Sequence, residues 1–143
     1  MFSEEEPEDF DPEMEVVSCF IEHDGEMLLL QRQDHKPQGG TWGMPAGKID
    51  DGENKREALS REVKEETGLE FSPESFDHFE TVYVRYPSYD FVYHMFYVSI
   101  DERQNVRVNP EEHKGFGWFE PQEAMNLRSI RGLDKCVEMF YDL

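Results

Sequence analysis

Short apolar runs separated by turn-forming residues occupy most of the chain, a pattern typical of β-strands. Val16–Ile21 and Met27–Gln31 are strand-like runs joined by a turn that contains Asp24-Gly25, a strong hairpin signal. Thr81–Arg85 and Asp90–Ile100 alternate in the same way on either side of a Pro-Ser turn. We therefore predict two hairpins.

Two stretches have helical spacing instead. Asn54–Thr67 is periodic and is followed by Gly68, a residue favoured directly after a helix. Gly115–Phe119 is a further short strand candidate, and it precedes the second helical stretch. Apolar residues near the end of the sequence recur at helical spacing: Ile130, Leu133, Val137, Phe140 and Tyr141. Together these patterns predict an α/β domain with a mixed sheet between helices.

The predicted mid-chain helix has an acidic face. On a helical wheel Leu59 and Val63 form the stripe that faces the core. Glu62, Glu65 and Glu66 lie together on one side of that stripe. Three carboxylates are therefore expected to converge at the edge of the core.

Such a face is unfavourable unless a cation binds to it. Glu62 lies three and four residues before Glu65 and Glu66, and like-charge pairs at this spacing cost roughly 0.2–0.5 kcal/mol each. Anions in the last helical turn oppose the helix dipole by roughly 0.3–1 kcal/mol each. Oxygen ligands select a hard cation, so Mg²⁺ is favoured and Mn²⁺ is a possible substitute. An ordinary solvated helix in an acidic protein explains this face equally well.

The overall charge restricts the partners. The 143 residues include 33 acidic and 14 basic side chains, a formal net charge of −19, which disfavours binding to long nucleic acid. A site that acts on phosphates would need local cations. Residues 1–14 hold seven acids, two prolines and no base, so we predict a poorly ordered acidic tail. Residues 15–143 are expected to form a single domain.

Cysteine content and hydropathy indicate the setting. Cys19 and Cys136 are the only cysteines and do not make a disulfide framework. No secretory signal pattern is present at the start, and the longest nearly apolar run, Phe91–Ile100, is too short to span a bilayer. These features predict a soluble, cytoplasmic protein with no membrane partner.

The segment Gly47–Leu69 resembles a complete Nudix box, G-x₅-E-x₇-R-E-U-x-E-E-x-G-U with U aliphatic. All nine specified positions match, and a chance match at one position has a probability on the order of one in a billion. Trp42–Gly47 is similar to the lead-in of this family. Trp118-Phe119 with Glu123-Ala124 resembles its last strand and helix.

The resemblance implies an α/β/α sandwich and hydrolysis of a phosphoanhydride bond in a nucleoside-diphosphate-linked substrate. It assigns the metal, expected to be Mg²⁺, to Glu62, Glu65, Glu66 and the backbone carbonyl of Ala46. It also implies a small-molecule nucleotide as the partner, and members of the family are often homodimers.

Other roles also follow from the resemblance. Arg61 and Glu53 look like a pair that holds the loop against the helix and keeps the metal ligands oriented. The catalytic base varies in the family, so Glu65, Glu53 and Glu112 are all candidates.

Substrate-binding residues are expected outside the helix as well. Arg32 and Arg85 lie near strand ends and could bind phosphates, although a solvated arginine is the alternative for each. Gly47 begins the box, where the backbone must be permissive. His94 shares a strand face with apolar residues and is expected to be a core histidine. Three aromatic residues could stack on a base, although core packing explains each as well: Trp42, Tyr86 and Tyr89.

Two other interpretations of the sequence compete with this one. Asp50-Asp51-Gly52 suggests an EF-hand, but aligning Gly52 with the loop glycine places Gly47, Ile49 and Ala58 at ligand positions, where they offer no chelating side chain. A Nudix-fold module that binds a nucleotide or protein without hydrolysis is the second alternative. The complete set of box carboxylates favours an enzyme. Its substrate could be a nucleoside triphosphate, an oxidised nucleotide or a nucleotide sugar.

Overall fold

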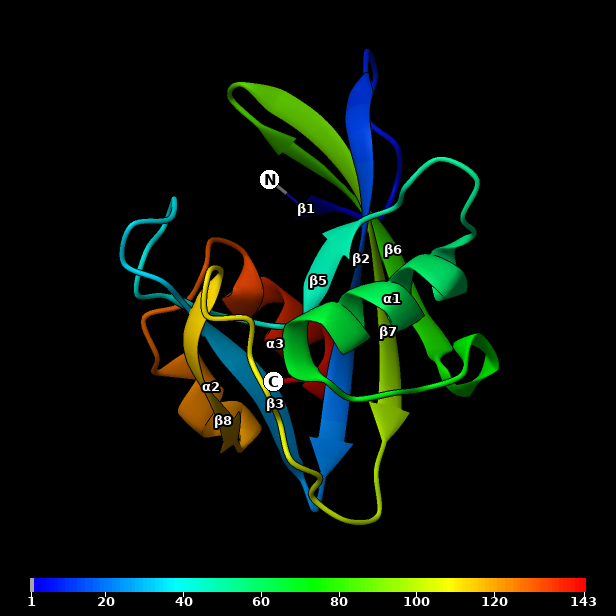
Figure 1. Ribbon diagram of the computed structural model, residues 1–143. Coiled ribbons are helices and arrows are strands. Elements are labelled where there is room, and N and C mark those ends of the chain that lie inside the picture. Colours follow the sequence, from blue (N-terminus) through cyan, green and yellow to red (C-terminus); the bar gives the residue numbers. More distant parts are fainter. Residues whose placement is uncertain (1) are drawn as a thin grey trace.

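The computed structural model describes residues 2–143 and contains one mixed sheet between helices (Figure 1). Along the sheet the strand order is β1-β6-β7-β2-β3-β4, with β5 paired to β2 and β8 paired to β3. The strands are β1 (Phe2–Ser3), β2 (Pro12–His23), β3 (Glu26–Arg32), β4 (Trp42–Gly43), β5 (Ala46–Lys48), β6 (Asp77–Tyr86), β7 (Tyr89–Ser99) and β8 (His113–Phe119). The helices are α1 (Lys55–Thr67), the 3₁₀ turn η1 (Pro73–Ser75), α2 (Pro121–Met125) and α3 (Leu133–Tyr141).

The two predicted hairpins and the predicted α/β/α arrangement are confirmed. β2 and β3 are antiparallel across the Asp24-Gly25 turn, and β6 and β7 are antiparallel along nearly their whole length. β2 and β7 run parallel, which makes the sheet mixed. Both central strands are covered on two faces, because each contributes buried side chains to both core clusters, and their apolar runs follow from this burial.

Alternate side chains of β2 face the two layers. Val17, Cys19 and Ile21 pack with Leu59 of α1 on one face. Phe20 points to the other face and stacks on Phe140 of α3, with ring centroids 4.2 Å apart. The helices on the two faces thus share one sheet as their common support.

The sheet opens between β2 and β3, and this opening positions the site. The two strands pair only beside their turn, at Glu22–Met27 and His23–Glu26. Farther along, β2 pairs with β5 through Val16 and Lys48, whereas β3 pairs with β4. The last turn of α1 borders the gap between the β2–β5 pair and the β3–β4 pair.

Capping residues fix the ends of α1. The Asn54 side chain accepts a hydrogen bond from the Glu57 backbone N–H, and the Glu57 carboxylate accepts one from the Asn54 N–H, each 2.9 Å long. Gly68 ends the helix with φ +77°, a conformation that glycine adopts without strain. The predicted helix and both its ends are confirmed.

The acidic N-terminal segment differs from the predicted tail. Phe2–Ser3 pairs with β6 as β1, and β2 already begins at Pro12, so no structural break separates residues 14 and 15. Apolar contacts explain the difference, because Phe10 meets Tyr83 edge to face at 5.3 Å. Both cysteines are free and buried. Within residues 2–143 no helix is both long and apolar enough to cross a membrane.

Candidate active site

The site begins where α1 lies against β5. A Cβ built on Gly47 would lie 2.0 Å from Cδ of Glu62, so only glycine leaves room for that carboxylate. The Ala46 N–H donates a 2.8 Å hydrogen bond to Oε1 of Glu66. β5 therefore fixes two of the three predicted metal-binding glutamates through backbone contacts.

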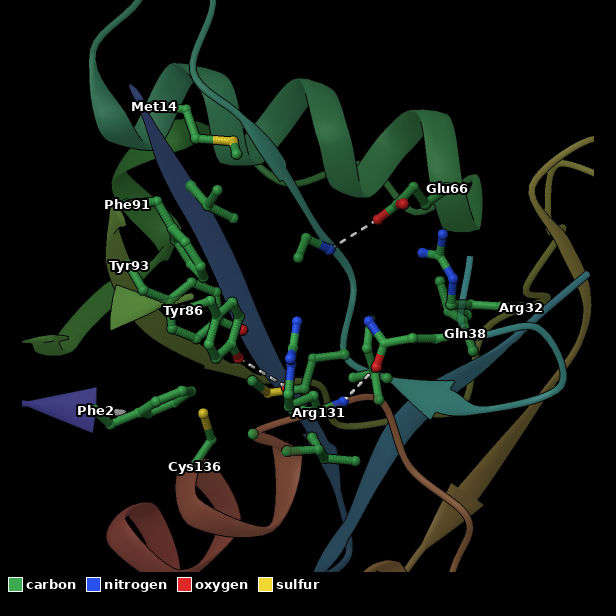
Figure 2. A pocket seen from close by; sticks show the side chains of 18 of the residues that line it. Phe2, Met14, Arg32, Gln38, Glu66, Tyr86, Phe91, Tyr93, Arg131 and Cys136 are labelled. Atoms are coloured by element: carbon green, nitrogen blue, oxygen red, sulfur yellow. Dashed lines mark hydrogen bonds between the residues drawn. The ribbon is translucent and has the colours of Figure 1, made fainter. Parts of the chain in front are cut away.

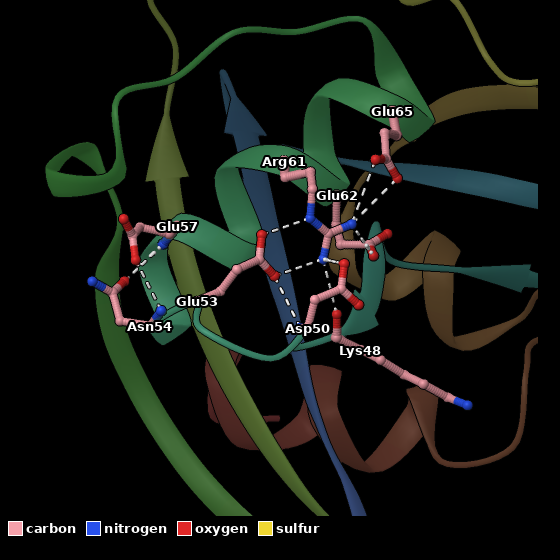
Figure 3. A network of polar contacts seen from close by, with 8 residues as sticks. All are labelled: Lys48, Asp50, Glu53, Asn54, Glu57, Arg61, Glu62 and Glu65. Atoms are coloured by element: carbon pink, nitrogen blue, oxygen red, sulfur yellow. Dashed lines mark hydrogen bonds and ion pairs between the residues drawn. The ribbon is translucent and has the colours of Figure 1, made fainter.

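Arg61 connects the loop before α1 to the helix (Figure 3). Its Nε donates to Oε2 of Glu53 at 2.7 Å and its Nη2 donates to Oε1 of Glu53 at 2.9 Å. Nη2 also donates to the Lys48 carbonyl at 3.1 Å. Hydrogen bonds from Arg61 and from the Asp50 N–H lower the pKa of Glu53 to about 2. The Arg61–Glu53 contact implied by the resemblance is present, in the bidentate geometry of strong charge-assisted pairs.

Arg61 also contacts two of the acidic residues on the helix. Its Nη1 lies 2.8 Å from Oε1 of Glu62 and 3.4 Å from Oε2 of Glu65. Burial raises the pKa of Glu62, and the Arg61 hydrogen bond opposes that shift. One guanidinium therefore offsets part of the repulsion expected for this face.

Glu66 has a different environment. Its carboxyl group forms no ion pair with a basic side chain among residues 2–143. Burial raises its pKa to about 8, and the charges of Glu62 and Glu112 push it in the same direction. Buried negative charge without a cation is unfavourable, so this position favours a bound cation.

The carboxylates do not form a ready metal cluster as their side chains stand. Across the part of the chain that the structure describes, no group of three or more His, Cys, Asp or Glu side chains is arranged to hold a metal ion. The contacts explain this result, because Glu62 and Glu65 turn to Arg61 while Glu66 turns to Ala46.

A cavity of about 230 Å³ adjoins Glu66 (Figure 2). It lies at the opening of the sheet, with Val16 and Ala46 on one side and Leu30 and Gly43 on the other. Aromatic residues of β1, β6 and β7 also line it, together with the segment that leads into α3 and the start of that helix: Phe2, Tyr86, Tyr89, Phe91, Tyr93, Ile130, Arg131, Gly132, Leu133 and Cys136.

Two arginines point into this cavity. Arg32, one of the predicted pair, lines it and donates from Nε to the Pro37 carbonyl at 2.8 Å. The second is Arg131, whose guanidinium lies 3.8 Å from the centre of the Tyr86 ring. Arg85 lies outside the cavity lining, because its side chain pairs with Asp90 at 3.1 Å on the hairpin.

The remaining candidates differ in whether they line the cavity. Tyr86 and Tyr89 line the cavity, whereas Trp42 packs edge to face on Phe119 and does not. Glu112 lies 3.2 Å from Lys36 and close enough to Glu66 to affect its pKa.

His94 is a satisfied core histidine, as predicted. Nδ1 lies 2.8 Å from Thr81 Oγ1 and Nε2 lies 2.8 Å from Glu15 Oε1, so both ring nitrogens have partners.

Sequence reasoning missed several residues of the cavity. Phe2, Gln38, His113 and Arg131 line it, and none belongs to the box. Gln38 accepts a 2.8 Å hydrogen bond from the Arg131 N–H through its side-chain oxygen, joining segments far apart in sequence. The available signals were Phe2, an aromatic residue inside the acidic segment, and Arg131, an arginine beside the predicted final helix.

Comparison with known proteins agrees with this geometry. The NUDIX domain family model matches residues 12–139. A CTP pyrophosphohydrolase of Escherichia coli is 32% identical over 114 residues, 78% of this chain and 79% of that protein. A human 8-oxo-dGDP phosphatase is 43% identical over 60 residues, 42% of this chain but 18% of that protein. The crystal structure of a MutT NUDIX hydrolase from Burkholderia pseudomallei superposes with a TM-score of 0.78 at 24% identity, covering 90% of this chain and 98% of that one. The chain therefore belongs to the Nudix family and is a Nudix hydrolase.

Proposed function

We propose that this chain is a Mg²⁺-dependent pyrophosphohydrolase that cleaves a phosphoanhydride bond in nucleoside di- or triphosphates. The observation that supports this most is the composition of the cavity. One end has the buried carboxyl of Glu66 and the guanidinium of Arg32, and the other end is aromatic (Figure 2). A nucleotide has the matching order of charged phosphates and flat base.

The donor set fits a hard divalent cation. Glu62, Glu65, Glu66 and the Ala46 carbonyl offer only oxygen atoms, the ligand type that Mg²⁺ prefers. Mn²⁺ accepts the same ligands. Binding has to compete with Arg61 for Glu62 and Glu65, whereas Glu66 has no competing cation. A bound cation would neutralise phosphate oxygens and lower the pKa of a water molecule.

The chain's own residues then have distinct tasks. Arg32 and Arg131 bind the nucleotide, because both guanidinium groups point into the cavity without a carboxylate partner among residues 2–143. Arg61 is a positioning residue that orients Glu62 and Glu65. Each such guanidinium also provides local positive charge against the net charge of −19.

Hydrolysis also needs a proton acceptor. Water attacks a phosphorus atom, the bridging P–O bond breaks, and the water proton passes to a carboxylate. Both oxygens of Glu53 are held by Arg61 and its pKa is about 2, so it is a poor base. We assign the base to Glu65 or Glu112. The side chain of Glu65 is 58% exposed at the end of α1, and that of Glu112 is 44% exposed and close enough to Glu66 to raise its pKa.

The relatives support the substrate class. One is a CTP pyrophosphohydrolase and another an 8-oxo-dGDP phosphatase, both acting on single nucleotides. The cavity of about 230 Å³ is below the roughly 300–1,000 Å³ of sites that enclose drug-sized ligands. A single nucleoside therefore fits this proposal better than a dinucleotide.

The test compares the wild type with Glu66→Gln on a panel of nucleoside di- and triphosphates with Mg²⁺, with products identified chromatographically. We expect the wild type to release pyrophosphate or phosphate and a nucleotide. Glu66→Gln should lower kcat by about 10³-fold, because it removes one ligand charge. Glu74→Gln, the same change on an exposed residue of η1, is the control and should keep full activity. An inert wild type across the panel would instead favour a Nudix-fold binding module.

A further inference from the structure

The end of the cavity away from the carboxylates is lined by Phe2. Figure 2 shows Phe2 and Cys136 at one end of the cavity and Glu66 and Arg32 at the other. If phosphates lie beside Glu66, as the proposed function requires, the nucleoside extends toward Phe2.

Phe2 is held in place by three kinds of contact. In the sheet it pairs with Val84 of β6. Its ring meets Tyr93 of β7 edge to face, with centroids 6.4 Å apart. It also lies directly on the backbone of Gly132, where an added Cβ would be 2.4 Å from its Cζ atom. The ring therefore contacts both the sheet and the residue before α3, and it forms part of the cavity wall between them.

The neighbouring walls suit a flat heterocycle. Tyr89 and Phe91 stack with centroids 5.8 Å apart, and Arg131 covers the Tyr86 ring at 3.8 Å. Base–aromatic stacking is worth about 1–3 kcal/mol per base and tolerates many bases, because every base has a π-face. Stacking alone therefore does not discriminate between bases. Any selectivity has to come from the depth of the cavity, which limits the size of the base.

We propose that Phe2 is a specificity-determining residue that limits the size of the base and favours pyrimidine over purine nucleotides. This inference rests on the proposed function. The phenyl ring of Phe2 is larger than the second ring that distinguishes a purine from a pyrimidine. Removing it extends the cavity at the nucleoside end by enough space for that ring, provided β1 stays in place.

The experiment measures kcat and KM of the full chain for CTP and GTP with Mg²⁺, in the wild type, Phe2→Ala and Phe10→Ala. A single-group difference in an apolar pocket changes selectivity by about 10–200-fold. We expect Phe2→Ala to raise the GTP-to-CTP ratio of kcat/KM by about 10-fold or more, mainly through KM. Phe10 is the matched control: it lies in the same acidic segment, contacts Tyr83 and Arg85, and does not line the cavity.

Phe2→Leu covers the case in which Phe2→Ala detaches β1 or fails to fold. It keeps an apolar wall and should shift the ratio in the same direction by a smaller factor. An unchanged ratio in both Phe2 variants, or an equal change in Phe10→Ala, would overturn the inference.

Equilibrium dialysis of the same two nucleotides separates this inference from the proposed function. If the wild type is inert but binds CTP more tightly than GTP, and Phe2→Ala loses that preference, only the proposed hydrolysis fails. If the wild type hydrolyses both nucleotides with no preference that depends on Phe2, only the role of Phe2 fails. If it neither hydrolyses nor binds them, both fail.

Discussion

Gly47 is the residue on which the position of the Glu62 carboxylate depends. Alanine there would place its Cβ 2.0 Å from Cδ of Glu62, so the side chain of Glu62 must move. Because displaced metal ligands and their supports typically cost 10–100-fold, we expect Gly47→Ala to lower kcat/KM by about that factor. Steady-state kinetics with Mg²⁺ check this. Gly115→Ala on β8 is the control, since a Cβ there meets nothing within 4 Å, and equal activity in the two variants would contradict the prediction.

Glu53 should make the stability of the protein depend on pH in the acidic range. Its pKa is lowered from 4.5 to about 2 in the folded state by hydrogen bonds from Arg61 and the Asp50 N–H. A lowered folded pKa stabilises the fold above the unfolded pKa, and this contribution is lost as pH falls through the folded pKa. Stability should therefore decline between about pH 4.5 and pH 2.

Chemical denaturation at several pH values measures this decline. Glu53→Gln has no titrating group at this position, so its unfolding free energy should fall less steeply over the same range. Glu74→Gln provides the same charge change outside the Arg61 network and should keep the wild-type slope. Parallel slopes in the wild type and Glu53→Gln would show that the ion pair does not affect folding.

At the residue scale, the fixed spacing of the Nudix box predicted which residues meet but not how their side chains turn. The box indicated which glutamates share a site and that Glu53 meets Arg61. It did not reveal that Arg61 also contacts Glu62 and Glu65, because those contacts depend on how the side chains turn. The repulsion expected between the glutamates therefore holds fully only for Glu66.

At the element scale, the strongly patterned segments were predictable and the short ones were not. α1 has a cap at each end and a clear apolar stripe, and the long strands have turn signals between them. β1, β4 and β5 are two or three residues long and exist because a distant strand pairs with each of them. Such pairing leaves no local periodicity, so the opening of the sheet could not be predicted.

The capping of α1 gives a prediction at this scale. Asn54 accepts the Glu57 N–H at 2.9 Å, and replacing an N-cap asparagine by alanine typically costs about 1 kcal/mol. We expect Asn54→Ala to lower the unfolding free energy by about that amount in urea. Lys55→Ala, an exposed residue at the next position, serves as the control and should change little. A cost below about 0.3 kcal/mol would mean that the cap contributes nothing beyond a solvated loop.

At the scale of the whole molecule, the cavity combines segments that lie far apart in sequence. Phe2 meets Gly132, and the Gln38 side chain meets the backbone of Arg131. No local pattern predicts such pairs, which is why the sequence placed Arg85 in the site and left out Arg131. The class of chemistry depends on one contiguous motif and was predictable, whereas the shape of the nucleoside end depends on tertiary packing.

The net charge of −19 is a property of the whole molecule with a measurable consequence. Like charges repel most when they are crowded in the folded state, so screening them should stabilise the fold. Raising NaCl from about 0.01 M to about 1 M shortens the Debye length from about 30 Å to about 3 Å, and we expect Tm to rise. Replacing the four exposed glutamates Glu4, Glu5, Glu6 and Glu8 by glutamine changes the formal charge from −19 to −15. Since this variant has less repulsion to screen, its Tm should rise less, by differential scanning calorimetry. An equal rise in both proteins would mean that salt acts through apolar burial rather than charge.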